Sequence, residues 1–532
     1  MVSNGVCSYS RTSYENTIKA LIHTDRASYR DLSYLPVFRA SGLFYVVVDR
    51  QRTTHVVFLN YWREKNGNTA VGALVSLRDK SGELCARFHF QVELTAYQIN
   101  TREIVEEFLG AGAAFEGSLE IEFHSDKDLK FAFPALYVCY ETPQGLSYVH
   151  TNQRTYNNAE DQRRGDPFNP AQTGFDVSCR GGARPFVFVV NGPIPIRADA
   201  GVLVYNAAGE ERRHEIELGF LAPYEARKLE LAELPGVRNF LGDEEGFIKL
   251  DLPLGGVFTR FASGVERADG KWLGITHSYF DCSDHADYYN TAALTDDQFP
   301  CFVPVNLVDG LNTEIVLYPI LAPSRLFLRI DCFDEAGRSR ASIDLPGTMD
   351  GSGRHQIRVD LRSILHEAGE EAAAGLYVLH IDAKDGRLPT RVTFGLNYRV
   401  GQKMGCNISS SVLMAPSYAT RARAWLWGLV ACRRGARNLI MLSHFSKVRG
   451  DETSAVVELS LYGMEGEICT KRYRMANATA LNIDADAMLA EAGYTFDETE
   501  FVWYVAQSEN PALIANQIHI SASGHVGGDH SF

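Results

Sequence analysis

Four turn signals at nearly even spacing constrain the fold of this chain more than any other feature of its sequence. In each, an apolar stretch runs into four residues that begin with Asp, Asn or Gly and end with Gly, which supplies the backbone freedom of a tight hairpin. The first residues of the four turns lie 127, 128 and 129 positions apart, and the turns are 79–82, 206–209, 334–337 and 463–466. Such regular spacing predicts an internal repeat.

Each turn is followed by the same succession of patterns. About 21 to 26 residues further on comes a short stretch with apolar residues at helical offsets and a closing Gly, as in "TREIVEEFLG" and "LRSILHEAG". Another apolar strand pattern follows each of these stretches. We therefore predict a mainly β protein of four tandem antiparallel β-sandwich units, each with one short crossover helix.

The repeat also predicts where the units begin and end. Residues 1–45 fall outside it and are interpreted as an N-terminal extension that caps the first unit, with Ile18, Leu21 and Ile22 on one face of a helix. The turn-rich stretches between the repeats place the four units at 46–160, 184–285, 301–412 and 437–532.

Charge and the absence of export or membrane signals limit the partners. The formal net charge is -14, and no long Lys/Arg block is present, so a nucleic-acid partner is not expected. The first residues lack the apolar run of a secretory signal, and no apolar stretch is long enough for a transmembrane segment. The ten cysteines form no regular framework, which favours a soluble cytoplasmic protein with free thiols.

A polar residue recurs near the end of each repeat. Aligning the last strand patterns by their apolar and Gly residues places His150, His277, Asn407 and His530 at equivalent positions. Two interpretations stay open. Each side chain could satisfy a local hydrogen bond within its own unit. Alternatively, the four strand ends could line one shared surface and approach a common ligand, which requires that the three imidazoles lie within about 10 Å of one another.

The stretch "ITHSYFDCSDHADYYN", residues 275–290, suggests a second candidate site. His277, Asp281 and His285 could converge on a divalent metal, since imidazole and carboxylate suit zinc, iron or manganese. Their spacing matches no established metal motif, and a solvated loop between units is the competing interpretation. The aromatic residues nearby, Tyr279 among them, would suit an organic ligand or a protein contact.

No strong catalytic motif accompanies the repeat, so an enzyme is less favoured than a binding or assembly protein. The predicted ligand is a carbohydrate or a protein, contacted by His150, His277, Tyr279, Asn407 and His530. The alternative is a metal-dependent or His acid/base enzyme with its site between repeats. No cofactor is predicted apart from a divalent metal in that alternative. The Arg- and Trp-containing segment 419–437 suggests either peripheral membrane contact or a buried strand between units.

Overall fold

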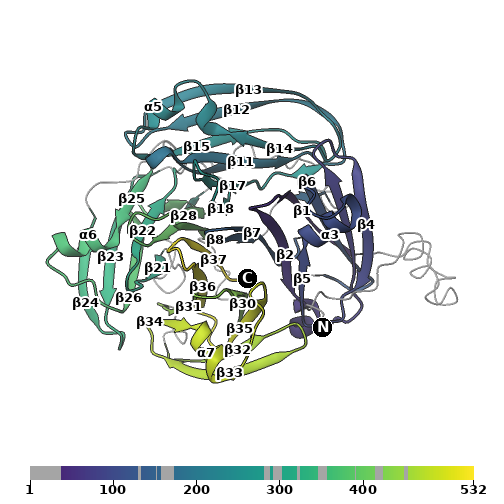
Figure 1. The fold of residues 1–532 in the computed structure, drawn as a ribbon. Helices are drawn as coiled ribbons and strands as arrows, with labels where there is room; N and C mark the ends of the chain where they lie inside the picture. Colours follow the sequence, from purple (N-terminus) through teal and green to yellow (C-terminus); the bar gives the residue numbers. More distant parts are fainter. Residues whose placement is uncertain are drawn as a thin grey trace.

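The computed structural model describes residues 38–129, 133–150, 153–156, 173–280, 288–290, 302–319, 324–345, 356–389, 391–413, 423–447 and 453–532. Antiparallel strands dominate them and form four pairs of sheets, which we call units 1 to 4 (Figure 1). The fold class predicted from the turn spacing is confirmed. Within these ranges, no helix combines the length and apolar character needed to cross a bilayer.

Each unit contributes eight main strands. In unit 1 these are β1 (Phe38–Val48), β2 (Thr53–Leu59), β3 (Gly72–Asp79), β4 (Leu84–Gln91), β5 (Ala96–Asn100), β6 (Phe115–Ser125), β7 (Leu136–Thr142) and β8 (Gly145–His150). In unit 2 they are β10 (Thr173–Ser178), β11 (Arg184–Val190), β12 (Ile196–Tyr205), β13 (Glu211–Leu221), β14 (Ala226–Glu230), β15 (Glu245–Asp251), β17 (Ala262–Glu266) and β18 (Leu273–His277).

Units 3 and 4 repeat the pattern. Unit 3 has β21 (Phe302–Asn306), β22 (Asn312–Leu317), β23 (Leu326–Phe333), β24 (Ser339–Asp344), β25 (Ile357–Asp360), β26 (Leu376–Ala383), β28 (Arg391–Arg399) and β29 (Cys406–Leu413). Unit 4 has β30 (Ala424–Ala431), β31 (Arg437–His444), β32 (Ala455–Tyr462), β33 (Glu467–Met475), β34 (Thr479–Asp484), β35 (Phe501–Ser508), β36 (Leu513–Ile520) and β37 (Val526–His530). The short strands β9 (Arg154–Thr155), β16 (Val257–Phe258), β19 (Tyr279–Phe280), β20 (Tyr288–Asn290) and β27 (Arg387–Pro389) complete the set.

The eight main strands have the same order in all four units, and in unit 2 the short strand β19 extends one sheet beyond β10. The first, third, fourth and sixth strands form one sheet, which we call sheet I, in the order β1-β6-β3-β4 in unit 1. The second, fifth, seventh and eighth strands form sheet II, in the order β5-β2-β7-β8. Apolar residues of both sheets fill the core between them, as in unit 2, where Val177 and Val202 of sheet I join Val187 and Val189 of sheet II. Identical topology in four successive units is the structural form of the repeat.

The predicted crossover helices lie between the fifth and sixth strands. They are α3 (Thr101–Leu109), α6 (Leu361–Glu367), α7 (Ala485–Glu491) and, in unit 2, a 3-10 turn at Leu231–Glu233 followed by α5 (Val237–Leu241). The side chains of Asn100, Asp360 and Asp484 cap the helices of units 1, 3 and 4. Unit 2 has Glu230 at the matching position, without a capping hydrogen bond, and Pro235 interrupts the segment. A second helix in unit 1, α2 (Tyr61–Asn66), was not predicted.

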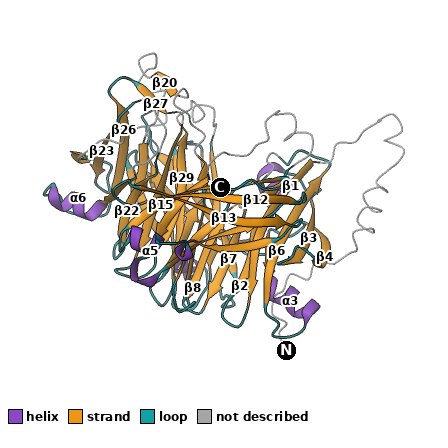
Figure 2. Ribbon diagram, turned by 90° about the horizontal axis from the view of Figure 1, so that it is seen from above, coloured by secondary structure: helices purple, strands orange, loops and turns teal. Residues whose placement is uncertain are grey.

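The units close into a ring because sheet I of each packs on sheet II of the next. Aromatic pairs mark the four junctions: Tyr45 with Phe188, Phe247 with Tyr318, Phe302 with Phe445, and Trp503 with Tyr137, at ring-centroid distances of 4.1, 5.9, 4.6 and 5.6 Å. Figure 1 shows β8, β18 and β37 near the centre and β4, β13, β24 and β33 at the rim. Figure 2 shows α3 and α5 toward one face of the ring and β20 and β27 at the other.

Three of the four units begin earlier in the structure than the sequence predicts. The first strands of units 1, 2 and 4 begin at Phe38, Thr173 and Ala424, ahead of the expected starts at 46, 184 and 437. Two further strands lie between each of these first strands and the turn signal of its unit, so the turn alone did not reveal them. The expected helix around Ile18 lies outside the described residues. The buried-strand interpretation of 419–437 fits β30, in which Trp425 and Trp427 are buried.

The four turn signals are hairpin turns, and those of units 1, 3 and 4 also contact the next unit. The carbonyl of Lys80 accepts a hydrogen bond from the Ala226 amide in unit 2, and the carbonyl of Met464 accepts one from Thr95 in unit 1. Gly82, at φ +93°, lies so close to unit 2 that a Cβ there would stand 2.0 Å from the Pro223 carbonyl oxygen. Gly82 therefore serves both the turn and the contact with unit 2.

We expect Gly82→Ala to lower the free energy of unfolding by about 1–3 kcal/mol, because the new methyl group meets backbone that cannot move aside. Gly110→Ala is the matched control. Gly110 has φ +101° and nothing within 4 Å of the new Cβ, so it reports the backbone strain alone. Urea unfolding of both variants measures the difference. Equal losses would contradict the proposed clash with unit 2.

Candidate functional site

The last strands of the four units meet at the centre of the ring. β8 lies against β18 and β37, and β29 lies against the same two strands. Each is the edge strand of its sheet II, so the four edges cover one another instead of facing solvent. The residues that end these strands are therefore brought together from sequence positions more than 100 residues apart.

Three of the four residues singled out from the sequence form a cluster there. The ring centroids of His150 and His277 lie 4.7 Å apart, those of His150 and His530 lie 4.1 Å apart, and those of His277 and His530 lie 6.4 Å apart. His150 and His277 are buried, and His530 is partly buried. The separation required for one shared site is met, and we call His150, His277 and His530 the histidine cluster.

Asn407 does not occupy the equivalent position in unit 3. The cap residues of the crossover segments, Asn100, Glu230, Asp360 and Asp484, pair with His55, Phe186, Glu314 and Leu439 of the second strands. In each unit, the second-strand residue two positions later pairs with a residue of the seventh strand, and that residue pairs in turn with one of the eighth strand. The eighth-strand residues reached in this way are His150, His277, Ser409 and His530. Asn407 lies two residues earlier than this position in β29. The sequence alignment was shifted because unit 3 is longer between its turn and this position: Ser409 lies 75 residues after Asp334, whereas His150 and His277 each lie 71 residues after the first residue of their turns.

Two further residues complete the cluster. Asp529 precedes His530, and its Oδ2 atom lies 2.9 Å from Nδ1 of His150. Arg260, just before β17, places Nη2 at 3.5 Å from Nε2 of His150 and at 3.2 Å from Nε2 of His277. Sequence reasoning did not select either residue. The dipeptide Asp529-His530 was a signal for the first, whereas nothing in the sequence near Arg260 pointed to the centre of the ring.

Burial controls the protonation of these groups. It holds the pKa of His150 well below the usual imidazole range, and the charges of His530 and Arg260 lower it further. Burial, with the charge of Arg260, has the same effect on the pKa of His277. Burial also raises the pKa of Asp529 to about 6. At neutral pH, His150 and His277 are therefore neutral imidazoles, each with one nitrogen that can donate and one that can accept.

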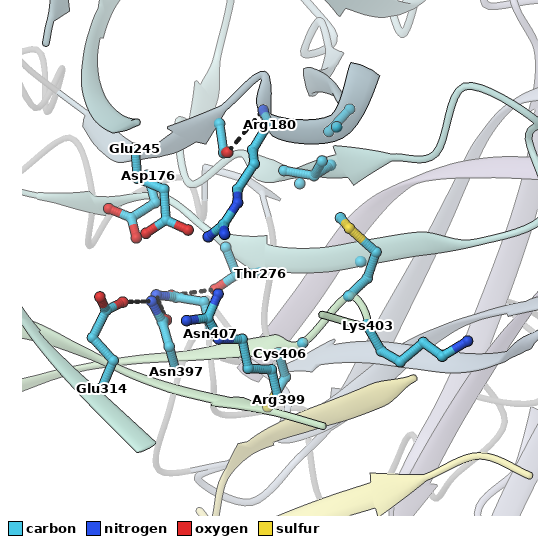
Figure 3. A pocket seen from close by; sticks show the side chains of 18 of the residues that line it. Asp176, Arg180, Glu245, Thr276, Glu314, Asn397, Arg399, Lys403, Cys406 and Asn407 are labelled. Carbon is cyan, nitrogen blue, oxygen red and sulfur yellow. Dashed lines mark hydrogen bonds between the residues drawn. The ribbon is translucent and has the colours of Figure 1, made fainter. Parts of the chain in front are cut away.

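A pocket of about 570 Å³ lies beside the cluster, at the junction of units 2 and 3 (Figure 3). Thr276 and Asn407 both line it, and the Thr276 hydroxyl donates to Oδ1 of Asn407 at 3.3 Å. Thr276 and His277 are adjacent in β18, and adjacent strand residues face opposite sides. The pocket and the histidine cluster therefore use opposite faces of the same strand.

A network of polar side chains crosses the junction at the pocket. Arg358 lies 2.8 Å from Glu314 of its own unit and 2.9 Å from Asp176 of unit 2, and it also pairs with Glu245. Burial raises the pKa of Asp176 to about 6, against the opposing charge of Arg358. Asn397 donates to Glu314 at 2.7 Å and accepts from Asn407 at 2.7 Å. The side-chain amide of Asn407 therefore hydrogen-bonds to Thr276 of unit 2 and to Asn397 of unit 3.

The remaining candidates lie elsewhere. Tyr279 is in β19, which pairs with β10 of sheet I, whereas the strand that carries His277 belongs to sheet II. Tyr279 is thus on a different sheet from the histidine cluster. Asp281 and His285, the other residues of the metal hypothesis for 275–290, lie outside the described residues.

The comparisons with known proteins do not identify a function. No protein-family model matches the sequence, and no curated protein matches it. Among solved structures, the chain is similar to an α-L-rhamnosidase from Streptomyces avermitilis complexed with L-rhamnose, at 12% identity and a TM-score of 0.14, over 64% of this chain and 37% of the rhamnosidase chain. It is also similar to a tetra-tandem repeat in the extending region of a large adhesion protein, at 8% identity and a TM-score of 0.08, over 92% and 98% of the two chains. Scores this low support no argument about function.

Proposed function

We propose that this protein is a non-enzymatic carbohydrate-binding protein whose ligand occupies the pocket between units 2 and 3. The observation that carries the proposal is the pocket itself, a cavity of about 570 Å³ with charged and amide side chains in its lining, built where two repeats meet. Cavities of roughly 300–1,000 Å³ suit small ligands, whereas a protein partner needs a much larger and flatter surface. A small polar ligand therefore fits this site better than a protein does.

The charges that line the pocket favour a ligand rich in hydroxyl groups. Five acidic and five basic residues line it: Asp176, Glu245, Asp269, Glu314 and Asp360, and Arg180, Arg267, Arg358, Arg399 and Lys403. Figure 3 shows Asp176, Glu245 and Glu314 toward one end of the pocket and Lys403 toward the other. A hydroxyl group donates to carboxylates and accepts from guanidinium or ammonium groups, so a sugar can satisfy both ends.

The experiment is a glycan array probed with the full-length protein, followed by calorimetric titration of the best glycan. We expect Arg399→Ala and Asn407→Ala each to weaken binding at least tenfold, since a hydrogen bond to a charged or well-placed polar group contributes about 1–3 kcal/mol. Arg434→Ala is the matched control because the Arg434 side chain is 86% exposed in unit 4, away from the pocket. Its affinity should equal that of the wild type.

Two results would overturn the proposal. The first is the absence of binding to any glycan on the array. The second is a glycan affinity that Arg399→Ala and Asn407→Ala both leave unchanged, which would place the ligand outside this pocket. Far-UV circular dichroism of each variant establishes that a loss of affinity does not arise from unfolding.

A further inference from the structure

We propose that the histidine cluster binds a divalent transition metal, with Nε2 of His150, His277 and His530 as the ligands and Asp529 as the carboxylate that orients His150. The four residues each offer a ligand atom, and these atoms all lie within 4.8 Å of one another. The site combines residues from units 1, 2 and 4, so it exists only in the closed ring. It is separate from the pocket between units 2 and 3.

The hydrogen bonds of the three imidazoles occupy Nδ1 of each ring and leave Nε2 as the nitrogen that can bind a metal. Nδ1 of His150 lies 2.9 Å from the Asp529 carboxylate. Nδ1 of His277 lies 2.9 Å from the Ser278 carbonyl oxygen, and Nδ1 of His530 lies 2.7 Å from the Ser531 carbonyl oxygen. Each bond requires the proton on Nδ1, so each Nε2 carries a lone pair. Histidines that bind metals in proteins are held in this way by a carboxylate or carbonyl group.

Arg260 marks the point on which two of these lone pairs converge. A single atom, Nη2, lies within hydrogen-bonding range of Nε2 of both His150 and His277, at 3.5 and 3.2 Å. A metal ion bound to these two nitrogens must replace the guanidinium there, and the remaining positive charge of Arg260 opposes it. We therefore expect Arg260 to weaken metal binding and to turn aside when the metal binds.

The number of imidazoles determines the class of site. Unit 3 has Ser409 at the equivalent register position, so the ring supplies three imidazoles instead of four. Three nitrogen ligands suit zinc, and sites with three protein ligands keep a coordination position for water or another small ligand. Zinc is therefore the ion that we choose as the probe.

The test is a titration of full-length, chelator-treated protein with Zn²⁺ in competition with a chromophoric chelator. We expect one Zn²⁺ per chain in the wild type and at least 100-fold weaker binding in His530→Gln, which lacks one ligand. Asp529→Asn should weaken binding about 10–100-fold, the usual effect of losing a carboxylate that orients a ligand. Arg260→Met should tighten binding. His366→Gln is the matched control, because His366 is an exposed histidine on α6, and it should behave as the wild type does.

Co²⁺ provides a second measurement that does not depend on the variants folding well. Binding to three imidazoles in the wild type should give the intense visible absorption of four-coordinate Co²⁺, and Zn²⁺ should remove it. Failure of the wild type to bind stoichiometric Zn²⁺, or unchanged binding in a folded His530→Gln variant, would overturn the proposal. So would equal losses in His530→Gln and His366→Gln, which would indicate binding to surface histidines.

Discussion

Replacement of Trp503 by alanine is expected to lower the free energy of unfolding by about 3–5 kcal/mol, the usual cost of removing a buried aromatic side chain. Trp503 lies in sheet I of unit 4 and is 0% exposed. Its ring packs against Tyr137 of unit 1, with 5.6 Å between the ring centroids, in an apolar cluster shared by units 1, 2 and 4. The cavity would therefore open where the first and last units close the ring. Chemical denaturation followed by circular dichroism measures the loss.

Val502→Ala separates the effect on the junction from the effect on a single unit. Val502 is the neighbour of Trp503 in β35, and it faces the core of unit 4 itself. Its truncation should cost about 1–2 kcal/mol, since fewer buried groups are removed. Trp503→Phe, which keeps an aromatic ring at the junction, should lose less than Trp503→Ala. A loss below about 1 kcal/mol in Trp503→Ala would show that this junction adds little stability.

Arg358→Ala is expected to destabilise the protein by about 3–5 kcal/mol near pH 7.5, because it leaves the carboxylates of Asp176, Glu245 and Glu314 together without their shared cation. The loss should be smaller near pH 5.5. Burial already raises the pKa of Asp176 to about 6 in the folded protein, against the charge of Arg358, and loss of that charge raises the pKa of Asp176 further above its value in the unfolded chain. The folded state of the variant then binds more protons than the unfolded chain, so its stability falls as the pH rises through the pKa of Asp176. Thermal unfolding at both pH values measures this dependence.

Two variants make this prediction specific to the network. Arg434→Ala removes an arginine whose partner, Glu498, lies 2.8 Å away on the surface, and it should change stability by less than about 1 kcal/mol at either pH. Glu245→Gln combined with Arg358→Ala should recover part of the lost stability, because one of the repelling charges is removed. A loss in Arg358→Ala that does not depend on pH would contradict the role assigned to the three carboxylates.

These two predictions describe different kinds of junction in one ring. Extended apolar clusters hold unit 1 against units 2 and 4 and unit 3 against unit 4. At the junction of units 2 and 3, the apolar contact is a small cluster of Tyr205, Phe247, Val316 and Tyr318, and the Arg358 network lies beside it. The pocket lies at this more polar junction. The ligand proposed above would therefore bind where the repeats are joined least by apolar contacts.

Much of the fold of each unit could be predicted from local sequence signals. The turn at 79–82 and its three counterparts identified the hairpins, and the helical patterns near Thr101, Leu361 and Ala485 identified the crossover helices. Both signals are local, because a tight turn and a capped helix depend on residues close together in sequence. The first strands of the units, such as β1 and β30, were missed because they have no such turn of their own.

The candidate site could be predicted only in part. The repeat selected His150, His277 and His530 because they end equivalent strands, and the structure brings these three together. It did not select Arg260 or Asp529, whose proximity depends on how units 1, 2 and 4 face one another. Asn407 was selected by an alignment two residues out of register. In the structure, Asn407 instead lines the pocket.

The sequence by itself determined that the chain contains four similar β-sandwich units, since repeated turns, apolar alternation and helix caps act over short distances. Only the tertiary structure decided that the units form a closed ring, that sheet I of each packs on sheet II of the next, and that three histidines more than 100 residues apart share its centre. The physical reason is that packing between units depends on the shape and polarity of whole sheet faces. No short stretch of the sequence contains that information.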